Sequence, residues 1–284
     1  ANIDIIHGAS SAAWQAMVKE KEEKLQGREQ QLCVINTKGE RQLLCSPKPV
    51  VSAELPALLR TQDRIFFDVS SYDLRGEAGK LLERAGPVVG FGTFDGESRE
   101  LEDFVAKESV FSSFRYERTW RQCVLEAEDF LVVYEKLVRE VICPSMKLKL
   151  GAEAPPITFY YQYPPTLRLQ PGPSRQFRRI HRDAEYGHQD GEVNFWMPLT
   201  DPAKTKVTLW VESTPDAGDF TAFELNHGEV GMFYGTHCRH WVPANETEYT
   251  RVSMDFRIGV GDCFDANWAL AGIAHVHPRR EISL

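Results

Sequence analysis

Histidine and aspartate side chains gather in the second half of the chain at spacings that suit metal binding. Seven of the eight histidines lie between His181 and His277, and two of them begin a His-x-Asp pair, His181–Asp183 and His188–Asp190. Residues i and i+2 of a strand point to the same face, so the imidazole and carboxylate of one pair can contact one ion. A third ligand from a distant strand would complete a facial triad and leave three coordination positions open, as non-haem iron(II) chemistry requires.

A second group of polar residues follows further along the chain. A glycine-bounded apolar run at 228–235 leads to His237 and His240, and a later alternating segment begins with Arg251 and continues to Ser253. The planar guanidinium of arginine donates two parallel, charge-assisted hydrogen bonds to a carboxylate, and Ser253 on the same face can donate a third. The pattern predicts a carboxylate clamp beside the metal.

The elements that must position these residues are short strands. From about residue 156, polar and apolar residues alternate in the segments 157–164, 166–170, 191–198, 207–213 and 251–258. Alternation indicates strands whose two faces meet different surroundings. Several such strands between Pro, Gly and Asp turns predict a sandwich, barrel or jelly roll. The polar faces either meet solvent or line the inside of an open barrel that holds a small polar ligand.

The first half of the chain has a more helical and mixed pattern. Polar helical spacing is found at 10–26, short strands are expected at 32–36 and 64–69, and the longest helix is expected at 116–142. Pro144 and the Pro155–Pro156 pair are expected to close that helical region. We therefore expect a single domain over 1–284. Its parts would be an N-terminal support region (1–150), a catalytic jelly-roll core (151–262) and a C-terminal tail (263–284).

Composition narrows the partners. The chain of 284 residues has a formal net charge of −8 and contains no block of Lys or Arg, which argues against nucleic acid as a partner. No stretch approaches the roughly 20 apolar residues of a membrane helix. The segment ANIDIIHGASSAAW has neither the basic start nor the apolar run of a signal peptide. Six scattered cysteines without a CxxC pair indicate a reducing compartment, so we expect a cytoplasmic protein. We expect it to be a monomer or a homodimer.

The motifs resemble those of a known superfamily. The sequence shows, in order, His-x-Asp-x-x-Tyr at 181–186, GEVNFWMPLTD at 191–201, LWVES at 209–213 and, after Gly228, a histidine, Asn245 and an Arg-x-Ser strand. This order over roughly 157–260 resembles the iron(II)/2-oxoglutarate-dependent oxygenases. Within them it is similar to the phytanoyl-CoA dioxygenase-like branch, especially a bacterial subgroup that includes a streptomycin-biosynthesis protein.

The resemblance implies a double-stranded β-helix, or cupin-like jelly roll, with N-terminal helices packed outside. It implies iron(II) ligands at His181, Asp183 and His240 and a 2-oxoglutarate site at Arg251, assisted by Ser253. Asn194 is expected to be a second contact to 2-oxoglutarate. The implied reaction uses O2 to oxidise a C–H bond and releases succinate and CO2. Halogenases of this superfamily replace the ligand carboxylate, whereas Asp183 is retained, so hydroxylation, desaturation or ring closure is expected.

Two choices between histidines depend on the same spacing. We favour His181 over His188 because only the first has Tyr186 and the NFWMPLTD segment at the family's distance. We favour His240 over His237 because His240 lies eleven residues before the clamp arginine, as in the family.

The other residues near these motifs are given lesser roles. His237 is expected to be structural or to lie behind a ligand, and His188 could still face substrate. Cys238 is expected to be a small packed residue. We expect a turn at His227 and surface positions for His275 and His277.

The sequence says less about the substrate than about the metal. Candidate substrate-binding residues on the expected inner faces are Arg168, Glu192, Trp196 and Trp210. Their mixture suits a small polar or zwitterionic molecule, with Glu192 meeting a cation and Arg168 an anion. The same groups could instead pair with one another inside the barrel. A long acyl-CoA is not expected, because no basic cluster for its phosphates is present.

Two other functions fit part of the pattern. A non-catalytic cupin-like binding protein would keep the alternating strands but would not need Arg251 and Ser253 beside the triad. A zinc hydrolase could use the same ligands but would need a general base near the metal-bound water, for which Glu192 is the obvious candidate.

Overall fold

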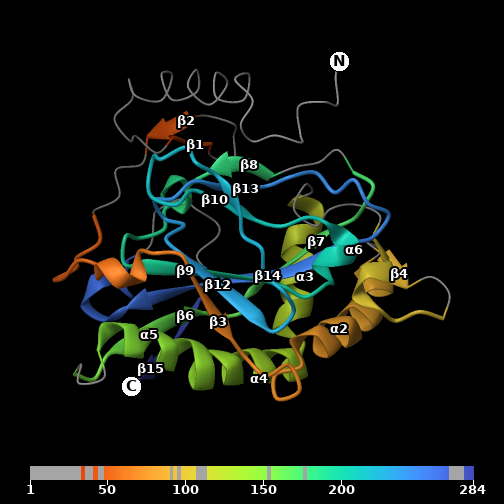
Figure 1. Cartoon of the computed structure of the whole chain (residues 1–284), viewed down its shortest axis with the longest axis horizontal. Coiled ribbons are helices and arrows are strands. Elements are labelled where there is room, and N and C mark those ends of the chain that lie inside the picture. Colours follow the sequence, from red (N-terminus) through yellow and green to blue (C-terminus); the bar gives the residue numbers. More distant parts are fainter. Residues whose placement is uncertain are drawn as a thin grey trace.

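The structure is a computed structural model that describes residues 33–35, 41–43, 48–89, 92–94, 97–106, 114–151, 155–174, 178–268 and 278–284. Its described part has three layers. Helices form the first layer, a large antiparallel sheet the second and a smaller antiparallel sheet the third (Figure 1). The helices cover one face of the large sheet, and the small sheet faces its other side.

Each sheet collects strands that are far apart in the chain. The large sheet has the order β15 (Arg279–Ser283), β6 (Thr158–Gln162), β14 (Arg251–Val260), β9 (Glu192–Pro198), β12 (Glu229–Phe233) and β3 (Asp63–Phe66), with β7 (Thr166–Gln170) also paired to β14. The small sheet has the order β11 (Thr221–Ala222), β10 (Trp210–Val211), β13 (His240–Val242) and β8 (Arg178–His181). The two facing antiparallel sheets form a jelly roll, which confirms the expected fold class.

The alternating sequence pattern sorts the residues of β14 between the two layers. Several of its odd-numbered residues lie opposite polar residues of β7 and β9; for example, Ser253 pairs with Arg168, and Arg257 with Asn194. Its even-numbered residues, such as Phe256, are apolar and buried. Helix α4 (Glu128–Leu137) packs on this apolar side, where the rings of Tyr134 and Phe256 lie 5.2 Å apart. The polar side is the inner face, turned toward the small sheet.

The helical layer differs from the expected single helix at 116–142. Helices α3 (Phe114–Leu125) and α4 are separate, a π-helical turn (Val138–Ile142) follows, and α5 (Cys143–Leu150) continues past Pro144. The expectation that Pro144 closes the region is wrong. Proline is accepted in the first turn of a helix, where its missing N–H would have no intrahelical partner.

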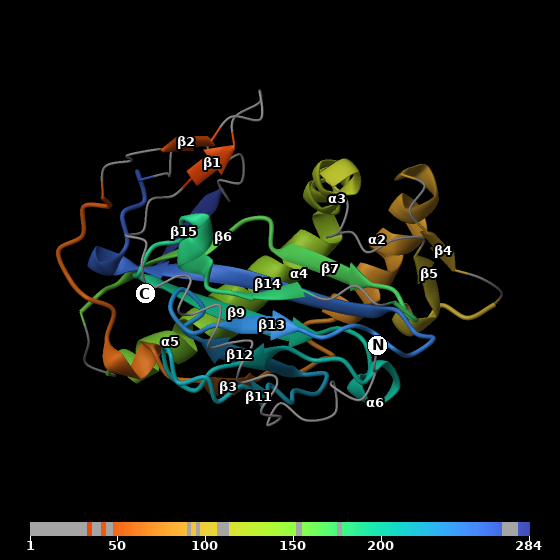
Figure 2. The same cartoon turned by 90° about the horizontal axis from the view of Figure 1, so that it is seen from above.

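Helix α2 (Leu74–Val89) was not anticipated from the sequence. It packs against α4 and against the hairpin of β4 (Gly92–Phe94) and β5 (Phe104–Ala106). Figure 2 shows this hairpin beside α2, at the opposite end of the molecule from β1 (Cys33–Ile35) and β2 (Arg41–Leu43). The remaining short elements are the 3-10 turns Ala57–Leu59, Leu101–Asp103, Asp183–Tyr186 and Gly261–Cys263, and the helix α6 (Pro202–Thr205).

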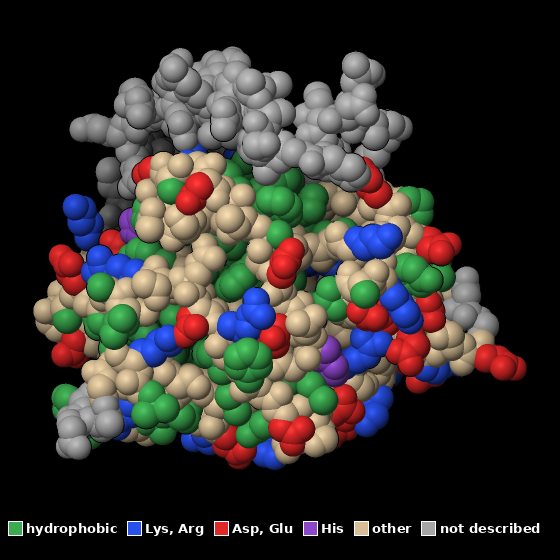
Figure 3. Space-filling view, in the orientation of Figure 1, with side chains coloured by type: hydrophobic (Ala, Val, Ile, Leu, Met, Phe, Trp, Pro, Cys, Tyr) green, Lys and Arg blue, Asp and Glu red, His purple; other side chains and the backbone are tan. Residues whose placement is uncertain are grey.

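Some sequence expectations fall outside the described residues. These are the helical pattern at 10–26 and the positions of His275 and His277. Among the described helices, none combines the length and apolar character needed to cross a membrane. On the face drawn in Figure 3, acidic and basic side chains of the described residues are interspersed.

The contact between α4 and the large sheet gives a stability prediction. Tyr134 is fully buried, and its hydroxyl donates a hydrogen bond of 2.7 Å to the carbonyl oxygen of Gln162. Tyr134→Ala is expected to lower the free energy of unfolding by about 3–5 kcal/mol, as for other buried aromatic truncations. Tyr134→Phe should cost only about 1 kcal/mol, the value of the lost hydrogen bond.

Urea denaturation of the three proteins measures both differences. Val132→Ala on the same helix is the matched control, because Val132 is 66% exposed and should change stability by less than about 0.5 kcal/mol. Equal losses for the buried and exposed positions would mean that α4 does not pack on the sheet as described.

Candidate metal centre

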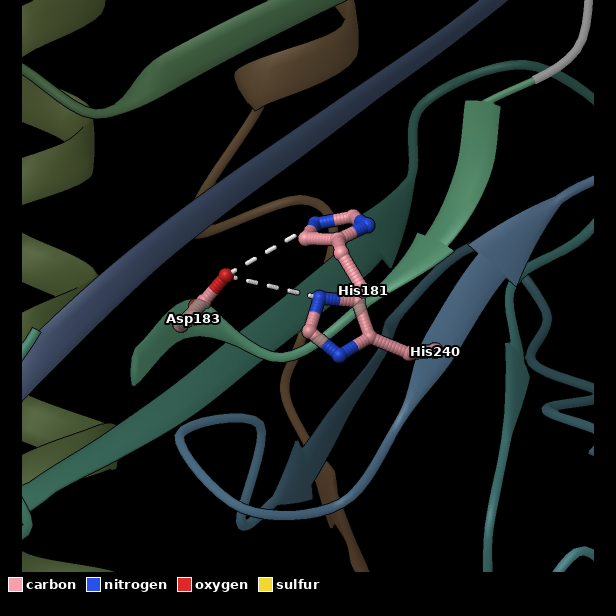
Figure 4. A group of neighbouring side chains, drawn as sticks. All are labelled: His181, Asp183 and His240. Atoms are coloured by element: carbon pink, nitrogen blue, oxygen red, sulfur yellow. Dashed lines mark ion pairs between the residues drawn. The ribbon is translucent and has the colours of Figure 1, made fainter. Parts of the chain in front are cut away.

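Two imidazoles and one carboxylate converge between the sheets (Figure 4). His181 is the last residue of β8 and lies directly opposite His240, the first residue of β13. The strand ends at His181, so Asp183 opens a 3-10 turn instead of continuing the strand. That turn is held by the Asp183 N–H, which donates to the Gly235 carbonyl at 2.9 Å.

The distances suit a single ion. The Oδ1 atom of Asp183 lies 3.8 Å from Nε2 of His181 and 3.5 Å from Nε2 of His240. Both separations are less than twice a metal–ligand bond of about 2.1 Å, so one ion can contact all three side chains. All three residues are buried. Among the described residues, they form a group of three His, Cys, Asp or Glu side chains that lie close enough together to hold one metal ion.

The orientation of each imidazole is fixed by its other nitrogen. Nδ1 of His181 lies 2.8 Å from the Arg179 carbonyl, and Nδ1 of His240 lies 3.1 Å from the Cys238 carbonyl. A carbonyl only accepts, so Nδ1 carries the proton in both rings and the Nε2 lone pairs face Asp183. Such backbone partners are typical of metal-binding histidines.

The second carboxylate oxygen of Asp183 is occupied by two hydrogen-bond donors on the side away from the imidazoles. Oδ2 accepts hydrogen bonds from Nδ2 of Asn194 at 2.5 Å and from Nε of Arg257 at 2.6 Å. Burial alone would raise the pKa of Asp183, but the guanidinium of Arg257 outweighs it and holds the pKa well below its usual range. The carboxylate is therefore ionised, with only Oδ1 directed at the imidazoles.

Arg251 lies on the same inner face, six residues before Arg257 on β14. It is buried, and its guanidinium donates to Oε1 of Gln170 at 3.0 Å and to Oγ of Ser253 at 2.9 Å. No carboxylate among the described residues forms an ion pair with it. Burial and the neighbouring Arg168 lower the pKa of Arg251 to about 9. It is thus a buried cation at neutral pH whose described partners are neutral.

Three of the four expected substrate-binding residues also face inward, and two of them are paired. Arg168 forms an ion pair with Asp255. The carboxylate of Glu192 contacts Nδ1 of His188 at 2.7 Å and Nη2 of Arg279 at 2.9 Å. These contacts agree with the alternative from the sequence analysis, in which Arg168 and Glu192 pair with other charged groups inside the barrel.

Trp196 is the third inward-facing residue. It is 3% exposed, and its Nε1 has no hydrogen-bond partner among the described residues.

Trp210 corrects an expectation. It pairs with Trp241, whereas its neighbour Val211 pairs with His240. Because successive residues of a strand alternate between faces, Trp210 lies on the side of the small sheet away from the side chain of His240. The sequence at 207–213 alternates, but its polar set points outward, so the inner-face placement of Trp210 is wrong.

The other described histidines do not belong to this cluster. His188 follows the 3-10 turn and contacts Glu192, while His237 is partly exposed and contacts Oδ1 of Asp190 at 2.8 Å. His227 lies in the expected turn, and Cys238 is buried as expected. The structure thus groups His181 and His240, and not His188 or His237, with Asp183.

Two inner-face residues were given no role beside the metal centre in the sequence analysis. Arg257 had a readable signal, because it shares the alternating face of Arg251 at an even separation. Arg279 had none, because it reaches the site only through the pairing of β15 with β6. Asn245, which was part of the sequence motif, proves to be a turn residue whose amide donates to the carbonyls of Gln170 and Tyr249.

The fold and the site together define a double-stranded β-helix protein with a two-histidine, one-carboxylate centre. No family model matches the chain. It is 34% identical over 166 residues to the streptomycin biosynthesis protein StrG of Streptomyces griseus, an alignment that covers 58% of this chain and 73% of StrG. The chain belongs to the family of StrG.

Solved structures of similar outline share little sequence. One is the non-heme alpha-ketoglutarate-dependent carbocyclase SnoK from nogalamycin biosynthesis, with 13% identity, coverage of 75% of this chain and 87% of SnoK, and a TM-score of 0.44. Another is EctD from S. alaskensis with 2-oxoglutarate and 5-hydroxyectoine, with 15% identity, coverage of 81% and 87%, and a TM-score of 0.43. The assignment of the fold rests on the sheet topology itself.

The geometry of the three side chains predicts which histidine matters for metal binding. His240→Ala is expected to weaken Mn(II) binding at least about tenfold, since loss even of an outer partner of a ligand costs that much. His237→Ala is the matched control, because its ring contacts Asp190 and not the cluster. Calorimetric titration of both variants measures the two affinities, and a larger loss in His237→Ala would refute the ligand set.

The buried Glu192 predicts a dependence of stability on pH. Burial alone would raise the pKa of Glu192, but Arg279 and His188 lower it from 4.5 to about 2. Because the folded-state pKa is depressed, the ionised carboxylate stabilises the fold above about pH 4.5. This contribution, about 3 kcal/mol, is lost as the pH falls toward 2.

Glu192→Gln should therefore be less stable than wild type at pH 6, and its free energy of unfolding should fall less between pH 5 and pH 3. Denaturant titrations at those pH values measure the slope. Parallel slopes for the two proteins would mean that Glu192 is not ion-paired in the folded state.

Proposed function

We propose that this chain is an iron(II)- and 2-oxoglutarate-dependent oxygenase. His181, Asp183 and His240 would hold the iron, and Arg251 with Ser253 would hold the distal carboxylate of 2-oxoglutarate. When bound, iron(II) and 2-oxoglutarate supply the activation of O2 for oxidation of a substrate C–H bond, with release of succinate and CO2.

The donor set fits this metal. Two imidazoles on adjacent strands and one carboxylate oxygen from the turn that follows are a donor set typical of non-haem iron(II) oxygenases, which need open positions for the co-substrate and oxygen. The protein's own part is to orient the ligands through the carbonyls of Arg179 and Cys238 and to keep Asp183 ionised through Arg257.

Arg251 is the observation that carries the proposal. A buried guanidinium is costly unless an anion accompanies it, yet its described partners are Gln170 and Ser253, both neutral. A dicarboxylate that reaches the metal with one end and Arg251 with the other would supply the missing anion. A cupin-like binding protein has no need of this cation.

The proposed substrate is a small polar metabolite. The proposed reaction is hydroxylation, in preference to desaturation or ring closure. The ion pairs on the inner face support a polar ligand, because an apolar one would leave them facing a poorly matched surface. The name of StrG, which places that protein in streptomycin biosynthesis, favours a substrate from a small-molecule biosynthetic route. Membership of the phytanoyl-CoA dioxygenase-like branch stays a prediction from the sequence motifs.

A zinc hydrolase is less well supported. It would need a general base with a pKa near neutrality close to the metal-bound water. Glu192 was the candidate, but with a pKa of about 2 and contacts to His188 and Arg279 it is a weak base.

Anaerobic titration of iron(II) with and without 2-oxoglutarate tests the proposal. The wild-type protein is expected to show the weak visible charge-transfer band of the iron–2-oxoglutarate chelate. In Arg251→Ala the apparent affinity for 2-oxoglutarate should fall at least about tenfold, because the charge-assisted bonds to one carboxylate are lost.

Arg139→Ala is the matched control, since that side chain is 54% exposed and lies on the helical layer. Absence of the band in wild-type protein fully loaded with iron would overturn the proposal. An unchanged affinity in Arg251→Ala would remove that residue from the co-substrate site.

A further inference from the structure

The two carboxylate oxygens of Asp183 have different surroundings: Oδ1 faces the imidazoles, and Oδ2 accepts hydrogen bonds from the large sheet. Its Oδ2 atom takes one hydrogen bond from a neutral donor, Asn194, and one from a cationic donor, Arg257. Asn194 and Arg257 are themselves cross-strand neighbours on β9 and β14. Because both donors come from the rigid large sheet, Asp183 is held with one oxygen available, and rotation to a two-oxygen contact would break both bonds.

The cationic donor also affects the charge of the site. Within the described inner face, the non-exposed charged positions of β7, β9, β14 and β15 are four guanidinium groups (Arg168, Arg251, Arg257 and Arg279) and two carboxylates (Glu192 and Asp255), and Asp183 adds a third carboxylate. Glu229 of β12 and Arg64 of β3 lie on the same face and pair with each other, so they add one charge of each sign. With neutral histidines, these groups together carry one excess positive charge before any metal arrives. A divalent cation raises the excess to three.

We propose that Arg257 and Asn194 are positioning residues with separable roles. Both fix the direction of Asp183, but only Arg257 cancels its charge and so makes metal binding depend on a dianionic co-substrate. The inference rests on the proposed function, because 2-oxoglutarate is the dianion concerned. Metal alone then binds weakly to a positively charged interior, and 2-oxoglutarate tightens it by lowering the excess charge from three to one.

This arrangement is a coupling between two ligands, so it must be reciprocal. If 2-oxoglutarate tightens the metal by a given factor, the metal tightens 2-oxoglutarate by the same factor. Coupling factors of about 5- to 150-fold are usual, and charges a few ångströms apart in a buried site are strong enough to produce them. Removing the charge of Arg257 should lower this factor, whereas removing the neutral donor should not.

The experiment measures the Mn(II) affinity of the full chain with and without saturating 2-oxoglutarate, in wild type, Arg257→Gln and Asn194→Ala. Wild type is expected to bind Mn(II) at least about tenfold more tightly with 2-oxoglutarate. In Arg257→Gln, binding of Mn(II) alone should be retained or tightened, and the coupling factor should fall at least about fivefold. In Asn194→Ala, both affinities should weaken together and the coupling factor should stay unchanged.

A second variant keeps the test informative if Arg257→Gln does not fold. Gln162 accepts a hydrogen bond of 3.3 Å from Nη1 of Arg257 through its Oε1 atom. Gln162→Glu would therefore place a carboxylate on Arg257 without removing the guanidinium, and it should lower the coupling factor in the same direction. Arg257→Lys, which keeps the charge, should retain most of the coupling. The d–d spectrum of bound Co(II) reports the coordination separately from the affinities.

The outcomes separate the inference from the proposed function. A charge-transfer band in wild type together with a coupling factor near one would overturn the inference and leave the function standing. Equal losses of both affinities in Arg257→Gln, with the coupling unchanged, would make Arg257 a purely structural residue. No band in iron-loaded wild type would overturn the function itself.

Discussion

The cross-strand pair of His181 and His240 is the contact on which the centre depends. Side chains alternate along a strand, so a slip of one residue between β8 and β13 would send one imidazole to the other face of the small sheet. The register of β13 is held from its other side by β10, where Val211 lies opposite His240. Arg239, just before the histidine, is tied to Glu212 by a buried ion pair. A short strand is thereby given a fixed register by side chains that never touch the metal.

The large sheet can carry charged side chains on its inner face because its other face forms the hydrophobic core with the helices. Tyr134 and Phe256 join the helices to that apolar face, which leaves the inner positions free for charged side chains. Buried charges are costly without partners, and most of those found here have one: Arg168 with Asp255, Arg257 with Asp183, and Arg279 with Glu192. Arg251 departs from this rule among the described residues, and it is also where the carboxylate clamp was predicted.

Sequence reasoning reached the parts of the molecule that have a short-range pattern. Period-two alternation predicted β7 at its observed bounds and the inner face of β14, and the motif order selected the three clustered side chains over His188 and His237. It failed where tertiary contacts decide. The side of the small sheet that faces inward cannot be read from an alternating segment, so Trp210 was misplaced. Proline is compatible with a helix start as well as a helix end, so α5 was missed.

The pairing of Arg279 with Glu192 has a consequence for how the molecule assembles. The two residues are 87 positions apart, and the opposite edges of their sheet, β3 and β15, come from segments more than two hundred residues distant in the chain. Contacts between residues far apart in the chain require long loops to close, and the entropy of loop closure is lost before the contacts stabilise the fold. Such contacts therefore make folding slow. The buried carboxylate of Glu192 gains the guanidinium of Arg279 as its partner only after β15 has joined the sheet. The polar interior between the sheets is thus completed late in folding, and chains in which β15 has not yet joined leave Glu192 without this ion pair.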